Sequence, residues 1–251
     1  MGGHSHWSQV KRQKGASDAK RGQVFTKLGR EITVAASEGG GDPAMNSRLR
    51  LALAKAREFN MPADTIDRAI KRGTGQLDDA KALVEATFEG YGPGGVAILV
   101  DTLSDNRNRT VSDVRMAFSR AGGSLGESGS VAWQFESRGV VLVDASEADP
   151  EEVALAAIDA GAEDVKIEEG RVEVYTAPTD VEKVRRSLEE AGVAVASAEL
   201  SMVAKSTIAL DEKQGAQVLR LLDTLESLDD VQRVYSNGDF PDSVLLEYAS
   251  R

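Results

Sequence analysis

The sequence predicts an α+β protein, with a small N-terminal helical bundle followed by two α/β-type domains. Apolar residues recur at helical spacing through the first 73 residues, which predicts helices there. From residue 83 onward, segments with a period near two alternate with amphipathic helical stretches. The formal charge also changes sign near this point, from +7 over residues 1–73 to -18 over residues 74–251. The change in pattern and the change in charge together predict a domain boundary.

Three helices are expected in the N-terminal segment. The first spans 17–38 and is closed by glycines 39–41, because glycine ends helices readily. The second spans 46–59. The third begins at Pro62, which suits a first helical position, and ends at Arg72 with Gly73 as its left-handed cap. These elements predict a compact three-helix bundle.

The next segment reads as strands and one helix. Alternation over 84–89 and the apolar run 96–102 predict two strands, the second buried on both faces. A helix is expected from Thr110 to Ala121, with Thr110 as its N-cap, and the stretch SVAWQF at 130–135 predicts a further strand.

Residues 139–204 follow the order βαββαβ, which is typical of the ferredoxin-like fold. The helices are expected at 150–160 and 179–191, and Thr179 with Glu182 fits a capping box. Beyond them, a strand at 206–210, a helix at 211–228 and a strand at 231–235 remain. These could complete the domain begun at residue 83, which would make 139–204 an insertion, or they could form a separate C-terminal unit.

Composition excludes several classes of function. The chain has no cysteine, which excludes disulfides, thiolate zinc sites and thiol nucleophiles. Its two histidines, His4 and His6, both lie at the N-terminus, and no G-x-S-x-G elbow is present. We therefore expect neither an enzyme, nor a cofactor, nor a metal site, nor a small-molecule substrate. A hydrolase with an unidentified carboxylate pair is a distant third hypothesis. The absence of a signal-peptide core and of an apolar run long enough to span a membrane predicts a soluble, cytoplasmic protein.

Cations gather at the N-terminus of this otherwise acidic chain. Before residue 17 no apolar stripe would fold the segment onto a core, so it reads as a flexible arm whose cations could contact phosphates and whose Trp7 could stack on bases. A second pair, in NRNRT, precedes the expected helix at 110, where free amides attract anions. The simpler interpretation of both groups is a solvated, positively charged surface. The candidate nucleic-acid-binding residues are His4, Trp7, Lys11, Arg12, Lys14, Lys20, Arg21, Lys27, Arg30, Arg107 and Arg109.

Several long motifs resemble the YebC family. They are GHSHWSQVKRQKGASDAKRGQVFTKLGREI at the start, GGGDP at 39–43, NMPADTIDRAIKRG at 60–73, EGYGPGG at 89–95 and DNRNRTVSDVR at 105–115. His6 stands where the family usually has Lys. The family includes bacterial proteins labelled probable transcriptional regulators and the mitochondrial translational activator of cytochrome c oxidase subunit I. The resemblance implies a helical first domain and a ferredoxin-like third domain inserted in the second. The expected domains are then 1–78, 79–138 plus 205–251, and 139–204.

Two hypotheses for the binding function therefore remain open. The resemblance implies a DNA-binding regulator of transcription, or a factor that acts on translating ribosomes and relieves stalling at proline-rich stretches. No recognition helix with base-reading side chains stands out, which weakens sequence-specific DNA reading. An arm with Trp beside Lys and Arg suits irregular RNA at least as well. We expect duplex DNA or ribosomal RNA as the partner, with the ribosome as a possible larger target and no membrane.

Overall fold

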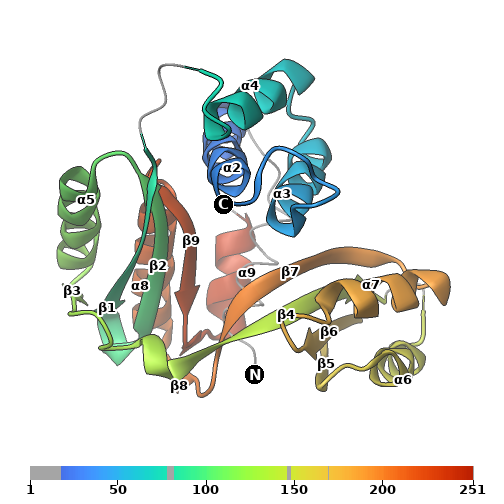
Figure 1. The fold of residues 1–251 in the computed structure, drawn as a ribbon. Helices are drawn as coiled ribbons and strands as arrows, with labels where there is room; N and C mark the ends of the chain where they lie inside the picture. The colour runs from blue at the N-terminus through green and yellow to red at the C-terminus, as the bar shows by residue number, and fades with distance from the viewer. Residues whose placement is uncertain (1–17, 78–81, 146–147, 169, 251) are drawn as a thin grey trace. The chain divides into compact units, whose positions relative to one another are not determined.

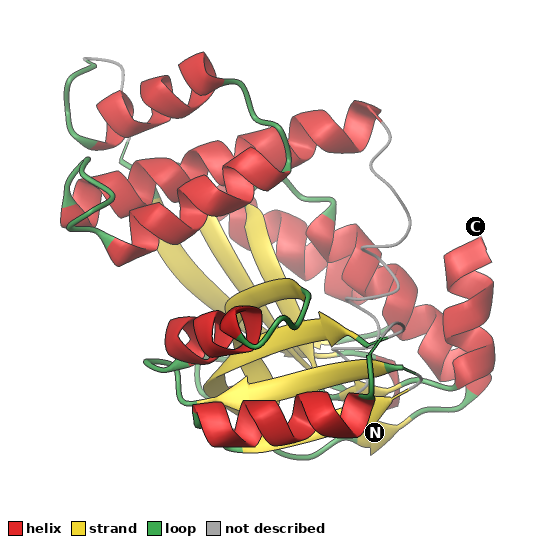
Figure 2. Cartoon of the chain, turned by 90° about the vertical axis from the view of Figure 1, so that its right-hand side faces the viewer, coloured by secondary structure: helices red, strands yellow, loops and turns green. Residues whose placement is uncertain are grey.

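A computed structural model describes residues 18–77, 82–145, 148–168 and 170–250 (Figure 1). The chain forms two compact units. The first comprises residues up to Ala132 together with those from Ser206 onward, and the second comprises Trp133–Lys205. Helices and antiparallel sheets occur together, which confirms the α+β class (Figure 2).

The first unit opens with three helices, which are α2 (Asp18–Gly39), α3 (Ser47–Glu58) and α4 (Ala63–Gly73). Their inward residues form one apolar core that includes Ile32, Leu49 and Ala56, each with 0% exposure. The helices are held closely together because Gly73 faces α2. A Cβ there would lie 2.2 Å from the Thr33 carbonyl oxygen. The left-handed residue after α4 is Gly75, not Gly73 as expected.

The first unit also contains a four-stranded sheet with the order β3-β1-β2-β9. Its strands are β1 (Val84–Tyr91), β2 (Ala97–Ser104), β3 (Ser124–Leu125) and β9 (Val231–Ser236). Helices α5 (Arg107–Arg120) and α8 (Glu212–Glu226) share a core with it, and all but one of the residues of β2 are buried, as the apolar run predicts. The unit also contains a short 3-10 turn (Pro93–Gly95), a parallel pair β8 (Ile208–Ala209) and β10 (Gly238–Asp239), and helix α9 (Asp242–Ser250). Strand β8 lies in the strand expected at 206–210, whereas β10 and α9 were not expected from the sequence.

The second unit contains four strands and two helices in the order βαββαβ. They are β4 (Phe135–Asp144), α6 (Pro150–Ala160), β5 (Asp164–Glu168), β6 (Arg171–Thr176), α7 (Val181–Glu190) and β7 (Val195–Ala204). The sheet order is β5-β6-β4-β7, all pairs being antiparallel, so the first and third strands are central, as in ferredoxin-like folds. Both helices pack on one face, in a core that includes Val141, Ala157 and Val184.

Three further local expectations were wrong. Helix α5 begins at Arg107, because the Asn106 side chain accepts the Arg109 N–H and acts as N-cap in place of Thr110. The stretch SVAWQF is not a strand, since residues 132–134 form a 3-10 turn and β4 begins only at Phe135. Helix α7 begins after Asp180 without a side-chain cap, so Thr179 forms no capping box.

Candidate nucleic-acid interface

Charge is divided sharply between parts of the chain. The described helical segment, residues 18–77, contains 11 Lys and Arg against 7 Asp and Glu, a net +4. The second unit, residues 133–205, contains 7 against 17, a net -10. A polyanion would therefore be attracted to the helical segment and repelled by the second unit.

The outward faces of α3 and α4 carry exposed cations of this segment. Leu49 and Leu53 turn inward to the core, while Arg50 and Arg57 are exposed. The two arginines are seven residues apart, or about two helical turns, so they share one face. Arg68 of α4 is also exposed, and within the described ranges the guanidinium groups of Arg57 and Arg68 form no hydrogen bond or ion pair. The sequence interpretation missed all three, although each stands opposite an apolar stripe that it identified.

Arg48, by contrast, forms ion pairs with three carboxylates. Its Nε lies 2.9 Å from Glu31 Oε1 and its Nη1 lies 2.7 Å from Glu38 Oε2, and it also pairs with Glu85 of β1. Partial burial opposes the charge, but hydrogen bonds to Glu31 and Glu85 outweigh it and raise the pKa of the guanidinium. Arg48 therefore joins elements of the first unit and offers little free charge to a ligand.

Lys27 and Arg30, two of the predicted binding residues, also have partners in the first unit. Lys27 Nζ donates to the Glu226 carbonyl oxygen at 2.6 Å. Arg30 Nη1 lies 2.9 Å from Asp230 Oδ1 and also donates to the Asp229 carbonyl. Their cations are thus already hydrogen-bonded to the end of α8 and to the residues just before β9, and a phosphate would have to compete with these acceptors.

Asp230 is the hydrogen-bond acceptor for Arg109, one of the two predicted cations of the NRNRT motif. Besides Arg30, this buried carboxylate accepts from Arg109 Nη2 at 2.8 Å, Thr110 Oγ1 at 2.8 Å and Ser104 Oγ at 3.0 Å. Burial alone would raise the pKa of Asp230, but the hydrogen bonds from these three side chains and the charge of Arg30 hold it below its ordinary value. Arg109 therefore has a structural partner, and a second ion pair to Asp105 raises the pKa of its guanidinium further.

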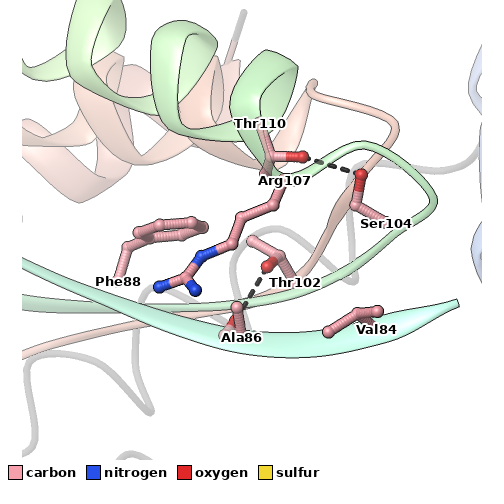
Figure 3. A pocket seen from close by; sticks show the side chains of 7 residues that line it. All are labelled: Val84, Ala86, Phe88, Thr102, Ser104, Arg107 and Thr110. Atoms are coloured by element: carbon pink, nitrogen blue, oxygen red, sulfur yellow. Dashed lines mark hydrogen bonds between the residues drawn. The ribbon is translucent and has the colours of Figure 1, made fainter.

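Arg107, the other cation of the NRNRT motif, is also exposed. It occupies the first position of α5, and Figure 3 shows its side chain extending past Phe88 and over Thr102. The hollow around it measures about 10 Å³, room for no more than one water. Within the described ranges its guanidinium has no hydrogen-bond partner. Arg107 is therefore a surface cation and not part of a small-molecule pocket.

Of the remaining predicted binding residues, only those in α2 lie within the described part of the chain. His4, Trp7, Lys11, Arg12 and Lys14 lie outside the described residues. Lys20 and Arg21 lie in α2, and the Arg21 guanidinium is 5.9 Å from the centre of the Phe25 ring. The described part of the chain holds no group of three or more potential metal-ligating side chains. None of its helices is long and apolar enough to cross a membrane.

Comparison with known proteins gives consistent matches along the chain. The family model for the TACO1/YebC protein N-terminal domain matches residues 5–76, and the model for the TACO1/YebC second and third domain matches residues 83–238. A probable transcriptional regulatory protein of Dehalococcoides mccartyi is 58% identical over 251 residues, covering 100% of both chains. One of Rubrobacter xylanophilus is 54% identical, covering 99% of this chain and 100% of the relative. The crystal structure of a conserved hypothetical protein from Aquifex aeolicus has a TM-score of 0.81 at 45% identity, covering 90% of this chain and 93% of that one.

Proposed function

Because the chain belongs to the TACO1/YebC family, we propose that it is a non-enzymatic regulator of gene expression that binds nucleic acid through its helical domain. The names of its relatives, probable transcriptional regulatory proteins, support the regulatory class. The observation that carries the proposal is the charge division, a net +4 on residues 18–77 against -10 on the second unit. A cytoplasmic location suits this role.

The proposed contacts are directed to the phosphate backbone. Arg57 and Arg68 are exposed, and no acceptor of the described residues occupies their guanidinium groups. Arginine donates to phosphate in a planar fork, which makes such groups effective backbone contacts. The basic arm, with Lys11, Arg12 and Lys14, would extend the same positive surface. Lys27, Arg30 and Arg109 would contribute less, since acceptors of the protein already hold them.

The composition of α3 favours backbone contact over base reading. Its sequence, SRLRLALAKARE, has no Asn or Gln, the residues that pair with adenine in the major groove, so its Arg and Lys side chains could read guanine but otherwise bind phosphates. A protein of this kind would bind DNA with little sequence preference, or would recognise RNA by shape. This observation supports a second candidate function, a translation factor that sets its basic domain against ribosomal RNA.

One paired experiment separates the two roles. The full chain is tested for co-sedimentation with ribosomes and, at physiological salt, for retardation of a promoter fragment against a scrambled fragment of equal length. The test variant combines Arg50→Ala, Arg57→Ala and Arg68→Ala. The control combines Lys213→Ala and Arg220→Ala, which remove exposed cations from α8 in the acidic part of the first unit.

A regulator of transcription should retard the promoter fragment preferentially, and a translation factor should co-sediment with ribosomes. In either case the triple variant should lose most of the binding while the control retains it. If both variants bind as the wild type does, the helical domain is not the binding surface and the proposal is wrong.

A further inference from the structure

The turn between α2 and α3 contains a methionine whose side chain is exposed to solvent. Met45 is 84% exposed, the highest value for any large apolar side chain among the described residues. Single solvent-exposed apolar residues are common on protein surfaces. Met45 stands in a loop, and its side chain contributes little burial to the fold. The surrounding turn shows how firmly it is held there.

One buried side chain anchors this turn. Asn46 is 6% exposed, and its Nδ2 donates to the Ala35 carbonyl at 2.7 Å and to the Gly40 carbonyl at 2.8 Å. Its Oδ1 accepts the Leu49 N–H, so the same residue caps α3. This close approach requires glycine at position 39, where a Cβ would lie 2.6 Å from Asn46 Nδ2. The residue next to Met45 is therefore fixed to both flanking helices.

The other side of the turn is also tied down. Asp42 accepts the Ala44 N–H through Oδ1 at 2.9 Å and the Met45 N–H through its carbonyl at 3.2 Å. Arg50 Nη1 approaches the Pro43 and Ala44 carbonyls at 3.3 and 3.5 Å. The backbone of the turn is thus held by hydrogen bonds on both sides. The exposed guanidinium of Arg50 contacts the carbonyl of Ala44, the residue that precedes Met45.

We propose that Met45 is an apolar contact for unpaired nucleobases of RNA, with Arg50 beside it on the phosphate backbone. This inference rests on the proposed function. Proteins that unstack DNA insert Met, Leu or Phe between bases, and a turn whose backbone is already held by hydrogen bonds does not have to be ordered on binding. Bases in loops and bulges are already unpaired, so inserting a side chain beside them costs less than opening a duplex. The positive charge of the helical segment, +4, favours a polyanion such as RNA over an apolar groove of a neutral or basic protein.

The test compares two exposed methionines of the full chain. Met45→Ala removes the proposed contact, and Met116→Ala removes a 46% exposed methionine of α5 as the matched control. Met45→Leu keeps an apolar side chain of similar size. The probes are an RNA hairpin with one 2-aminopurine in its loop and a fully paired RNA duplex of the same length. Affinity is measured over a range of salt concentrations, together with the 2-aminopurine fluorescence of the complex.

Met45→Ala should weaken hairpin binding about tenfold at every salt concentration, as expected when an apolar side chain loses a buried contact. The dependence of log K on log salt should stay unchanged, because no phosphate contact is lost. The fluorescence change on binding should shrink, duplex binding should stay unaffected, and Met45→Leu and Met116→Ala should behave as the wild type. Equal hairpin affinity of Met45→Ala and the wild type would overturn the inference, as would an equal loss on the duplex.

The same data distinguish this inference from the proposed function. If wild-type binding shows no salt dependence, the phosphate contacts of the proposed function fail. If wild-type binding is salt-dependent but Met45→Ala leaves hairpin affinity intact, only the nucleobase contact fails. If Met45→Ala lowers ribosome co-sedimentation without changing affinity for either RNA, Met45 contacts protein and the inference is overturned.

Discussion

Replacing Asp230 by Asn should destabilise the first unit by about 2 to 3 kcal/mol. The carboxylate is 5% exposed and receives hydrogen bonds from Ser104, Arg109 and Thr110 in addition to the ion pair with Arg30. Asn keeps the size and one acceptor oxygen, but it leaves two guanidinium groups without their shared counter-ion. Removing one partner of a fully buried ion pair costs about 3–5 kcal/mol. We expect less here because the Arg109 side chain is 46% exposed and water can solvate it.

The effect should depend on pH in a defined direction. The folded protein holds the pKa of Asp230 below the ordinary value of 3.8. A depressed carboxyl pKa contributes stability that is fully present above the unfolded pKa and is lost as the pH falls through the folded pKa. The difference between wild type and Asp230→Asn should therefore be largest at neutral pH and should shrink below about pH 4.

Thermal unfolding followed by circular dichroism measures this difference. A loss of about 2 to 3 kcal/mol corresponds to a midpoint lower by about 4 to 12 °C for a unit of this size. The control is Asp229→Asn, which removes the neighbouring, exposed carboxylate. If Asp230→Asn unfolds at the wild-type temperature at pH 7, the carboxylate does not stabilise the fold and the structural role assigned to Arg109 is wrong.

Two further perturbations test the packing of the first unit. The Glu89 carboxylate accepts three backbone N–H groups of residues 129–132 at 2.6–2.8 Å, so Glu89→Gln should cost about 1–3 kcal/mol and accelerate amide hydrogen exchange in that loop. Unchanged exchange there would contradict this role. Gly73→Ala would place a Cβ 2.2 Å from the Thr33 carbonyl oxygen and should cost at least about 1–3 kcal/mol, whereas Gly22→Ala, with open space around it, should be neutral or stabilise α2 by about 0.5–1 kcal/mol. Denaturant midpoints measure both, and equal effects of the two substitutions would refute the close packing of α2 on α4.

Helices whose ends are set by neighbouring residues could be predicted from the sequence. The helix expected at 150–160 has these bounds in the structure, because Asp149 caps it, Pro150 suits its first position and Gly161 ends it in the left-handed conformation. The helix expected at 211–228 begins after Asp211, whose capping box with Gln214 is equally local. The order βαββαβ in the second unit is likewise visible as a change of hydrophobic period.

Contacts between distant residues could not be predicted in the same way. Arg109 and its partner Asp230 are 121 residues apart, and no local pattern indicates that they meet. The NRNRT motif therefore looked like a pair of free cations, whereas only Arg107 has no hydrogen-bond partner among the described residues. The stretch SVAWQF alternates like a strand, but the 3-10 turn at 132–134 forms where the Val131 and Ala132 amides bond to the Glu89 carboxylate.

The candidate interface was likewise predictable in part, because its net charge follows from the sequence whereas the availability of each cation depends on distant contacts. The sequence identifies the excess of cations in the helical segment, since charge can be counted without a structure. Which of them are available depends on tertiary partners, because Lys27, Arg30 and Arg48 are held by acceptors from other elements while Arg57 and Arg68 are not. Exposure of a cation is a property of the fold.

The most direct test of the account is the salt dependence of RNA binding by the full chain. Each phosphate contact contributes about -0.7 to the slope of log K against log salt for a single strand. The combined substitution of Arg50, Arg57 and Arg68 by Ala should make the slope less steep by about 2. An unchanged slope in the triple variant would contradict the claim that these arginines contact the backbone of a nucleic acid.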